Sequence, residues 1–130
     1  MMSNDYYELQ YDGTANRIHC SVKGFWRSPG VVPGYLDDWK KLLARVKPGF
    51  TVLANATGMT VLPPLEVRAL HEQVEELCLE KGLSKIGEVV SAAVIEPSTS
   101  KIYRQHELVA VKKQFRDITR AITWLNSTGE

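Results

Sequence analysis

The sequence has few of the residues that mark several large classes of protein. Its two cysteines, Cys20 and Cys78, are too far apart for a metal-binding or redox motif. No apolar run approaches the ~20 residues of a membrane-spanning helix. The formal net charge of +1 gives no argument for nucleic acid or an anionic membrane as a partner. The segment 1–5 lacks the basic and apolar regions of a signal peptide. We therefore expect a cytoplasmic protein with reduced cysteines and no membrane span.

Length and hydrophobic content set the scale of the fold. The chain has 130 residues, of which 44% are hydrophobic, enough for one domain with its own core. We expect a single domain over residues 1–130, with frayed tails at 1–5 and 126–130.

Alternating residues predict a β-hairpin near the N-terminus. The first run, 6–11, places Tyr7 and Leu9 on one face, and the second run, 17–23, does the same with Ile18 and Cys20. The intervening residues 12–16 contain Asp and Gly and favour a turn. We expect the polar face of this hairpin, which includes Arg17, to be solvated.

The central part of the chain predicts a strand–helix–strand crossover. A helix from Pro33 ends before Pro48 and Gly49, and an apolar strand follows at 50–54. A long helix then begins near residues 63–64 and is closed by Gly82, and the next strand spans 86–95. The apolar stripe of the long helix consists of Val67, Leu70, Val74, Leu77 and Cys78.

The C-terminal part predicts further elements. Ser98, Thr99 or Ser100 caps a third helix over 101–110, a short edge strand covers 111–115, and Asp117 caps a last helix. The expected fold is therefore α/β, a single-domain mixed sheet of about four to five strands. It has an N-terminal hairpin, right-handed β-α-β crossovers and about four helices.

This order of elements resembles the STAS family. The resemblance is carried by the strand Lys47-Pro48-Gly49-Phe50-Thr51-Val52-Leu53, the Ile-Gly-x-Val-Val strand at 86–90, and Ala121-Ile122-Thr123-Trp124-Leu125 near the end. It is nearest to the stand-alone SpoIIAA-like branch of anti-sigma-factor antagonists, and it implies a STAS/SpoIIAA-like fold and a regulatory role through protein contacts.

One motif of that branch is missing. An Asp-Ser-Ser-Gly segment, whose serine is phosphorylated, follows the central strand in the family. Here the corresponding stretch contains Leu62-Pro63-Pro64-Leu65, with no acceptor hydroxyl. The phosphorylation switch therefore does not carry over to this chain.

Three loops leave the carboxyl ends of the expected strands, at 26–30, 55–60 and 96–100. Such loops meet at one edge of a sheet, where ligands of α/β proteins bind. Either these loops form an ordinary polar rim, which is the commoner case, or they form a surface for a partner or small anionic group. The candidate residues are Trp26, Arg27, Ser28, Asn55, Thr57, Thr60, Ser98, Thr99 and Ser100. For Asn55 and Thr57 ordinary turn chemistry is the simpler explanation.

The sequence contains no catalytic or metal-binding constellation that we recognise, and we expect no enzyme, metal or cofactor. Glu88 lies in an apolar strand and is a candidate general base if it is buried. We favour a structural role, in which Glu88 either lies at a solvated part of the sheet face or pairs with a basic residue such as Lys23 or Arg17. His19, His71 and His106 fall on separate elements, with His71 expected on an exposed helix face.

Charge is unevenly distributed along the chain. Residues 101–120 carry a local balance of +4, and residues 66–80 a balance of −4. The usual meaning is two solvated faces, but such patches could also steer a protein partner or a homodimer.

Two functions follow from the sequence. The first is a non-enzymatic STAS-like regulatory domain that acts by protein–protein interaction. The alternative is a carrier or sensor of a small apolar or amphipathic, lipid-like ligand, suggested by the apolar loop residues Trp26, Met59, Val61 and Leu62. An apolar pocket beneath them would favour the alternative.

Overall fold

One mixed sheet contains every strand in the described part of the chain. The structure is a computed structural model that describes residues 2–58, 63–91 and 97–127. The strands are β1 (Met2–Ser3), β2 (Tyr7–Asp12), β3 (Arg17–Val22), β4 (Thr51–Asn55), β5 (Lys85–Val89), β6 (Thr99–Arg104) and β7 (Glu107–Phe115). The helices are the 3-10 helix η1 (Pro29–Val31), α1 (Tyr35–Leu43), α2 (Leu65–Glu80) and α3 (Ile118–Asn126).

The sheet has the order β1-β2-β3-β4-β5-β7-β6. Strands β3, β4, β5 and β7 run parallel, while β1, β2 and β6 pair antiparallel with their neighbours. The predicted hairpin is present as β2 and β3. The predicted crossover is also confirmed, because Val52 of β4 pairs with Ile86 of β5 in parallel. The short strand β1 lies within the segment expected as a tail.

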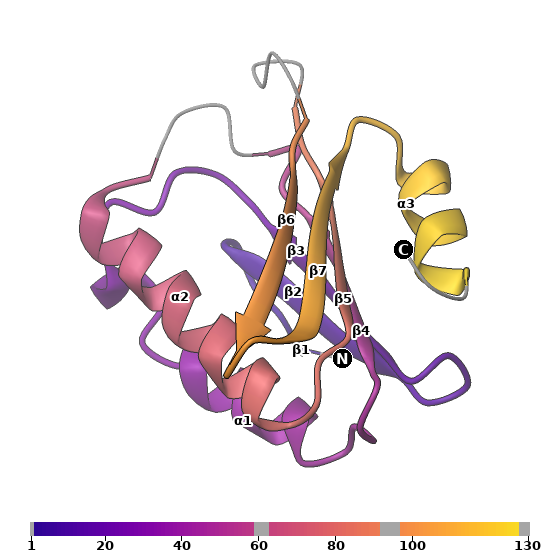
Figure 1. Cartoon of the computed structure of the whole chain (residues 1–130). Coiled ribbons are helices and arrows are strands. Elements are labelled where there is room, and N and C mark those ends of the chain that lie inside the picture. The colour runs from indigo at the N-terminus through magenta and orange to yellow at the C-terminus, as the bar shows by residue number, and fades with distance from the viewer. Residues whose placement is uncertain (1, 59–62, 92–96, 128–130) are drawn as a thin grey trace.

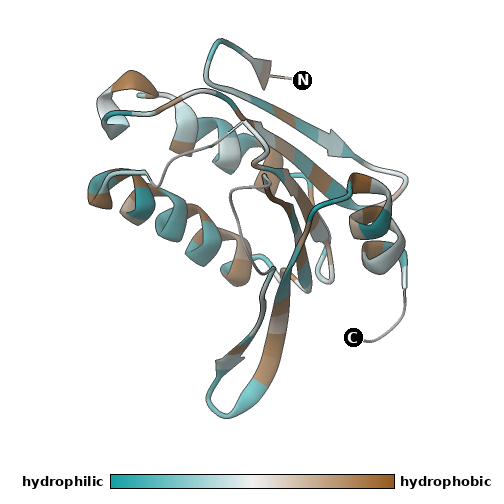
Figure 2. Cartoon of the chain, turned by 90° about the horizontal axis from the view of Figure 1, so that it is seen from above, coloured by the Kyte–Doolittle hydropathy of each residue, from teal (hydrophilic) through white to brown (hydrophobic). Residues whose placement is uncertain are grey.

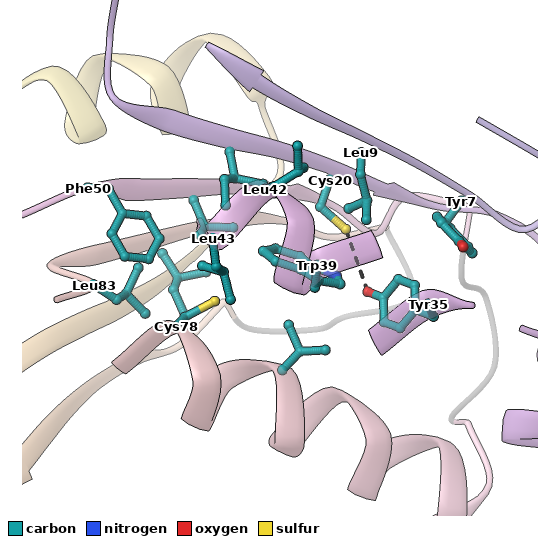
Figure 3. Packing of buried hydrophobic residues seen from close by; sticks show 14 of the residues in the cluster. Tyr7, Leu9, Cys20, Tyr35, Trp39, Leu42, Leu43, Phe50, Cys78 and Leu83 are labelled. Atoms are coloured by element: carbon teal, nitrogen blue, oxygen red, sulfur yellow. Dashed lines mark hydrogen bonds between the residues drawn. The ribbon is translucent and has the colours of Figure 1, made fainter. Parts of the chain in front are cut away.

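Helices cover both faces of this sheet. Figure 1 shows α1 and α2 on one side of the strands and α3 on the other. The larger core lies under α1 and α2, where Tyr35, Trp39 and Cys78 pack toward Leu9 and Cys20 of the sheet (Figure 3). A smaller core joins α3 to Leu53 and its neighbours.

Helix α2 follows the predicted apolar stripe. Val67, Val74 and Cys78 are buried, and Leu70 and Leu77 are partly buried. These positions recur every three to four residues, so one face of the helix meets the core.

The second face of the sheet corrects the expectation that the polar side of the hairpin is solvated. Arg17 is 6% exposed, and its guanidinium donates to Thr51 Oγ1 at 2.9 Å and to Asn126 Oδ1 at 2.8 Å. Lys85 Nζ donates to the carbonyls of Trp124 and Ser127, at 3.1 and 2.9 Å. A cation at carbonyls of the last turn complements the helix C-terminus. Two basic residues therefore fix α3 on the face that was expected to meet water.

The predicted third helix over 101–110 is wrong, and so is the edge position of 111–115. These residues form the β6–β7 hairpin, and β7 lies between β5 and β6. Its turn residues Gln105 and His106 have φ of 52° and 70°. Positive φ at both positions matches the twist of a two-residue hairpin, but the turn lacks the Asn-Gly signature that would reveal it. The described chain thus has seven strands and three α-helices, against four to five strands and about four helices expected.

None of the helices described here combines the length and apolar character that crossing a bilayer requires.

Candidate functional site

A cavity of about 680 Å³ lies between α2 and the sheet, on the side that α1 also covers. Its size falls within the ~300–1,000 Å³ of small-molecule sites. Three sets of residues surround it: a floor from the strands, a wall from α1 and α2, and a polar end toward β7. Figure 2 shows α1 and α2 along one side of the sheet and α3 on the other.

Two rows of paired residues form the floor. One row crosses the sheet as Val52, Ile86 and Lys112, and the other as Cys20, Ala54, Glu88 and Gln114. In both rows the side chains are apolar or weakly polar on β3 and β4 and become charged or polar toward β7. The floor is therefore graded in polarity, and the small side chain at Ala54 leaves space at its centre.

The wall is largely aromatic. Tyr35 and Trp39 come from α1, and His71 comes from α2. The His71 ring lies 5.2 Å from the ring of Trp26 and 5.8 Å from that of Tyr35, measured between centroids. Burial lowers the pKa of His71, with Lys112 adding to the effect and Glu88 opposing it. The imidazole is therefore held in its neutral form.

Two ring nitrogens on this wall are buried without a hydrogen-bond partner among the described residues: Trp39 Nε1 and His71 Nε2. Burial raises the pKa of the Tyr35 phenol well above its ordinary value, and the nearby Trp39 indole N–H acts in the opposite direction. The Tyr35 hydroxyl itself lies 3.7 Å from Cys20 Sγ (Figure 3). Trp39 and His71 both belong to the cavity lining, so the cavity is bounded by rings with polar edges.

Charged groups from three elements meet at the polar end. Lys112 Nζ of β7 lies 3.6 Å from Glu88 Oε2 of β5 and 3.7 Å from Glu75 Oε2 of α2. Gln114 Nε2 donates to Glu88 Oε1 at 2.9 Å. Glu88 is thus paired with a basic residue, which is one of the two structural roles expected for it, but the partner is Lys112 in place of Lys23 or Arg17.

The cavity thiols are protonated at neutral pH. Burial raises the pKa of both Cys20 and Cys78 to about 12. A thiol in this state is a poor nucleophile, so the cysteines contribute apolar surface to the cavity.

The candidate loop residues divide between this cavity and the surface. Asn55 lines the cavity, and its Oδ1 accepts from the Thr57 backbone and hydroxyl, at 3.0 and 2.7 Å. Ser98 N and Oγ both donate to Gln114 Oε1, which links that loop to Glu88. Trp26, expected to offer its ring to a partner, is buried at 2% exposure, and its indole N–H donates to the carbonyls of Tyr6 and Lys23.

The other candidates lie outside the cavity lining. Arg27, Thr57, Thr99 and Ser100 are exposed, and Ser28 is partly buried beside η1. Thr60 lies outside the described residues, as do Met59, Val61 and Leu62.

Sequence reasoning missed most of the site, and His71 and Lys112 illustrate why. His71 was expected on an exposed face, yet it lies four residues after Val67 and three before Val74, so the helical period already placed it on the buried stripe. Lys112 gave no such signal, because its two partners come from elements far away in the sequence.

Part of the expected charge asymmetry is neutralised within the chain. Besides Lys112 with Glu75, Arg104 Nη2 of the basic run lies 3.0 Å from Glu76 Oε2 of the acidic run. Both pairs link the β6–β7 hairpin to α2. The Arg104–Glu76 pair is exposed, so its stabilisation is a modest ~0.2–1 kcal/mol.

The described residues contain no group of three or more His, Cys, Asp or Glu side chains that could hold a metal ion. Comparison of the chain with protein-family models, curated proteins and solved structures gave no match. The resemblance to the STAS family and the regulatory role that it implies therefore stay predictions.

Proposed function

We propose that this chain binds a small amphipathic ligand in the cavity between α2 and the sheet, as a carrier or sensor. The proposal assigns binding to the chain and no catalytic step. The observation that carries it is a cavity of about 680 Å³ whose floor passes from apolar side chains on β3 and β4 to Glu88, Lys112 and Gln114 toward β7. A ligand with an apolar body and a polar end matches this change in polarity.

The floor of the cavity sets the orientation of such a ligand. Its apolar body would lie over Cys20, Val52 and Ala54, where β3 and β4 offer apolar side chains. Its polar end would lie toward Glu88 and Lys112, whose charged groups can form hydrogen bonds with it. This arrangement explains why an amphipathic molecule fits better than a purely apolar one.

Binding of the neutral dye Nile red tests this proposal, because its fluorescence rises in an apolar site. We expect saturable binding to the wild type. Ala54→Phe should weaken it at least about tenfold, since the ring fills the centre of the floor, whereas Ala44→Phe at an exposed site should leave it unchanged. Absence of saturable binding, or equal binding by Ala54→Phe, would overturn the proposal.

The regulatory function expected from the STAS resemblance is compatible with ligand binding, since a sensor domain can act on a protein partner. It stays a second prediction.

A further inference from the structure

We propose that the ligand carries a positively charged amine, which binds at the polar end of the cavity between the carboxylates of Glu75 and Glu88. This inference rests on the proposed function, because it assigns the chemical class of ligand to the same cavity. It follows from the charge balance and geometry of the polar end and from the apolar lining of the rest of the cavity.

The described residues that line the cavity are short of one positive charge. Their carboxylates belong to Glu72, Glu75 and Glu88, and their cations to Arg68 and Lys112. Three negative charges against two positive ones leave a local balance of −1. One ligand ammonium neutralises this balance, whereas a ligand carboxylate would raise it to −2 and meet like charges from two elements.

The geometry of Lys112 leaves room for a second cation. A single ammonium lies between two carboxylates, at 3.6 and 3.7 Å, and both distances exceed the 2.7–2.9 Å typical of a charge-assisted hydrogen bond. The nearest oxygens of Glu75 and Glu88 therefore keep acceptor capacity. Because the side chains of Glu88 and Lys112 are only 22% and 32% exposed, water screens an added charge there less than at an open surface.

The rest of the lining supplies an independent reason to expect a ligand. Beyond the polar end, the cavity of about 680 Å³ is lined by apolar and aromatic side chains that include Val52, Ala54 and Trp39. A cavity of this size and lining accommodates the apolar body of a small molecule. Together the two parts of the lining define an amine joined to an apolar or aromatic body.

Three compounds that share an indole ring and differ in charge test which kind of ligand the cavity prefers. Tryptamine is the cation, tryptophol is neutral and indoleacetic acid is the anion. Each is titrated against Nile red bound to the wild type at neutral pH. We expect tryptamine to displace the dye at least about fivefold more tightly than tryptophol, and indoleacetic acid to be the weakest competitor. Tryptophol or indoleacetic acid competing as well as tryptamine would overturn the inference.

Substitutions of the two carboxylates test whether the ligand amine binds between them. Glu88→Gln keeps an oxygen for Gln114 but removes one charge, so the advantage of tryptamine over tryptophol should fall about five- to tenfold, with tryptophol itself unchanged. Glu75→Gln should act in the same direction. Glu66→Gln is the matched control, because Glu66 is an exposed carboxylate of α2 outside the cavity.

The two proposals fail in different ways. If Nile red binds and Ala54→Phe removes it, but the preference for tryptamine is absent or survives Glu88→Gln and Glu75→Gln, the amine inference is wrong and ligand binding stands. If Nile red does not bind the cavity, both are wrong.

Discussion

At the scale of single residues, the buried imidazole of His71 makes the stability of the folded protein depend on pH. Its ring packs against Trp26 and Tyr35, and burial lowers its pKa from 6.5. Burial also lowers the pKa of His19. In the unfolded chain these groups take up a proton near their ordinary pKa, while the folded protein keeps them neutral to lower pH. Their contribution to stability is therefore complete above about pH 6.5 and is lost as the pH falls below it.

We expect the free energy of unfolding, measured with urea, to decrease between pH 7.5 and pH 5.5. His71→Gln should flatten this decrease, because the variant removes one group that the unfolded state protonates preferentially. His106→Asn serves as the control, since His106 is exposed at a turn with positive φ that Asn tolerates. A pH dependence unchanged by His71→Gln would contradict the assignment.

At the scale of elements, the end of α2 depends on a close approach between two turns. Gly82 has φ of +94°, and a Cβ on it would lie 2.9 Å from Pro48 Cα. The Gly49 N–H donates to the Gly82 carbonyl at 2.7 Å, which holds the turn before β4 against the turn before β5. This contact sets where two neighbouring parallel strands of the cavity floor begin.

Gly82→Ala and Gly49→Ala separate the energetic cost of a side chain at positive φ from the cost of its close approach to Pro48. Both residues have positive φ, but a Cβ at Gly49 meets nothing within 4 Å. We expect Gly49→Ala to lower the free energy of unfolding by about 1–2 kcal/mol from the backbone alone. Gly82→Ala should cost clearly more, since backbone atoms of Pro48 must also move. Equal urea midpoints for the two variants would show that the approach is not tight.

At the scale of the whole molecule, the sheet has a hydrophobic core on each face, and the two cores are covered by different helices. The α1/α2 side contains the cavity, whereas α3 closes the other side with Trp124 and Leu125. The Trp124 ring is 9% exposed, lies 5.7 Å from the Phe115 ring, and lies 5.0 Å below Lys85 Nζ. The α3 side therefore has its own core, and it supports the strands from behind the cavity.

Trp124→Ala should lower the free energy of unfolding by about 3–5 kcal/mol, because it removes a large ring from the smaller core. That is a large part of the ~5–15 kcal/mol of a typical domain. Ile118→Ala, on the same helix but 44% exposed, should change it by no more than about 1 kcal/mol. Similar urea midpoints for the two variants would mean that α3 does not close a core.

Much of the fold was accessible from local patterns, but the site was less so. The stripe of α2 and the cap of α3, where Asp117 Oδ1 accepts from Thr119 N at 2.7 Å, follow from residues close together in sequence. Of the cavity, only Asn55 and Glu88 were singled out beforehand for a site role. Lys112 reaches two carboxylates through strand pairing, which a local pattern does not record.

The sequence by itself determined the crossover between β4 and β5, the N-terminal hairpin and the helices at 35–43, 65–80 and 118–126, because period, caps and turn residues act within a few residues. Only the tertiary structure decided that 99–115 forms a hairpin, since the pairing of β7 with β5 outweighs local helix signals and a turn without glycine. It also decided that Arg17 and Lys85 are buried beneath α3, and that Lys112 meets Glu75 and Glu88. Burial and charge pairing depend on which distant segments meet, and that is set by the packing of the whole chain.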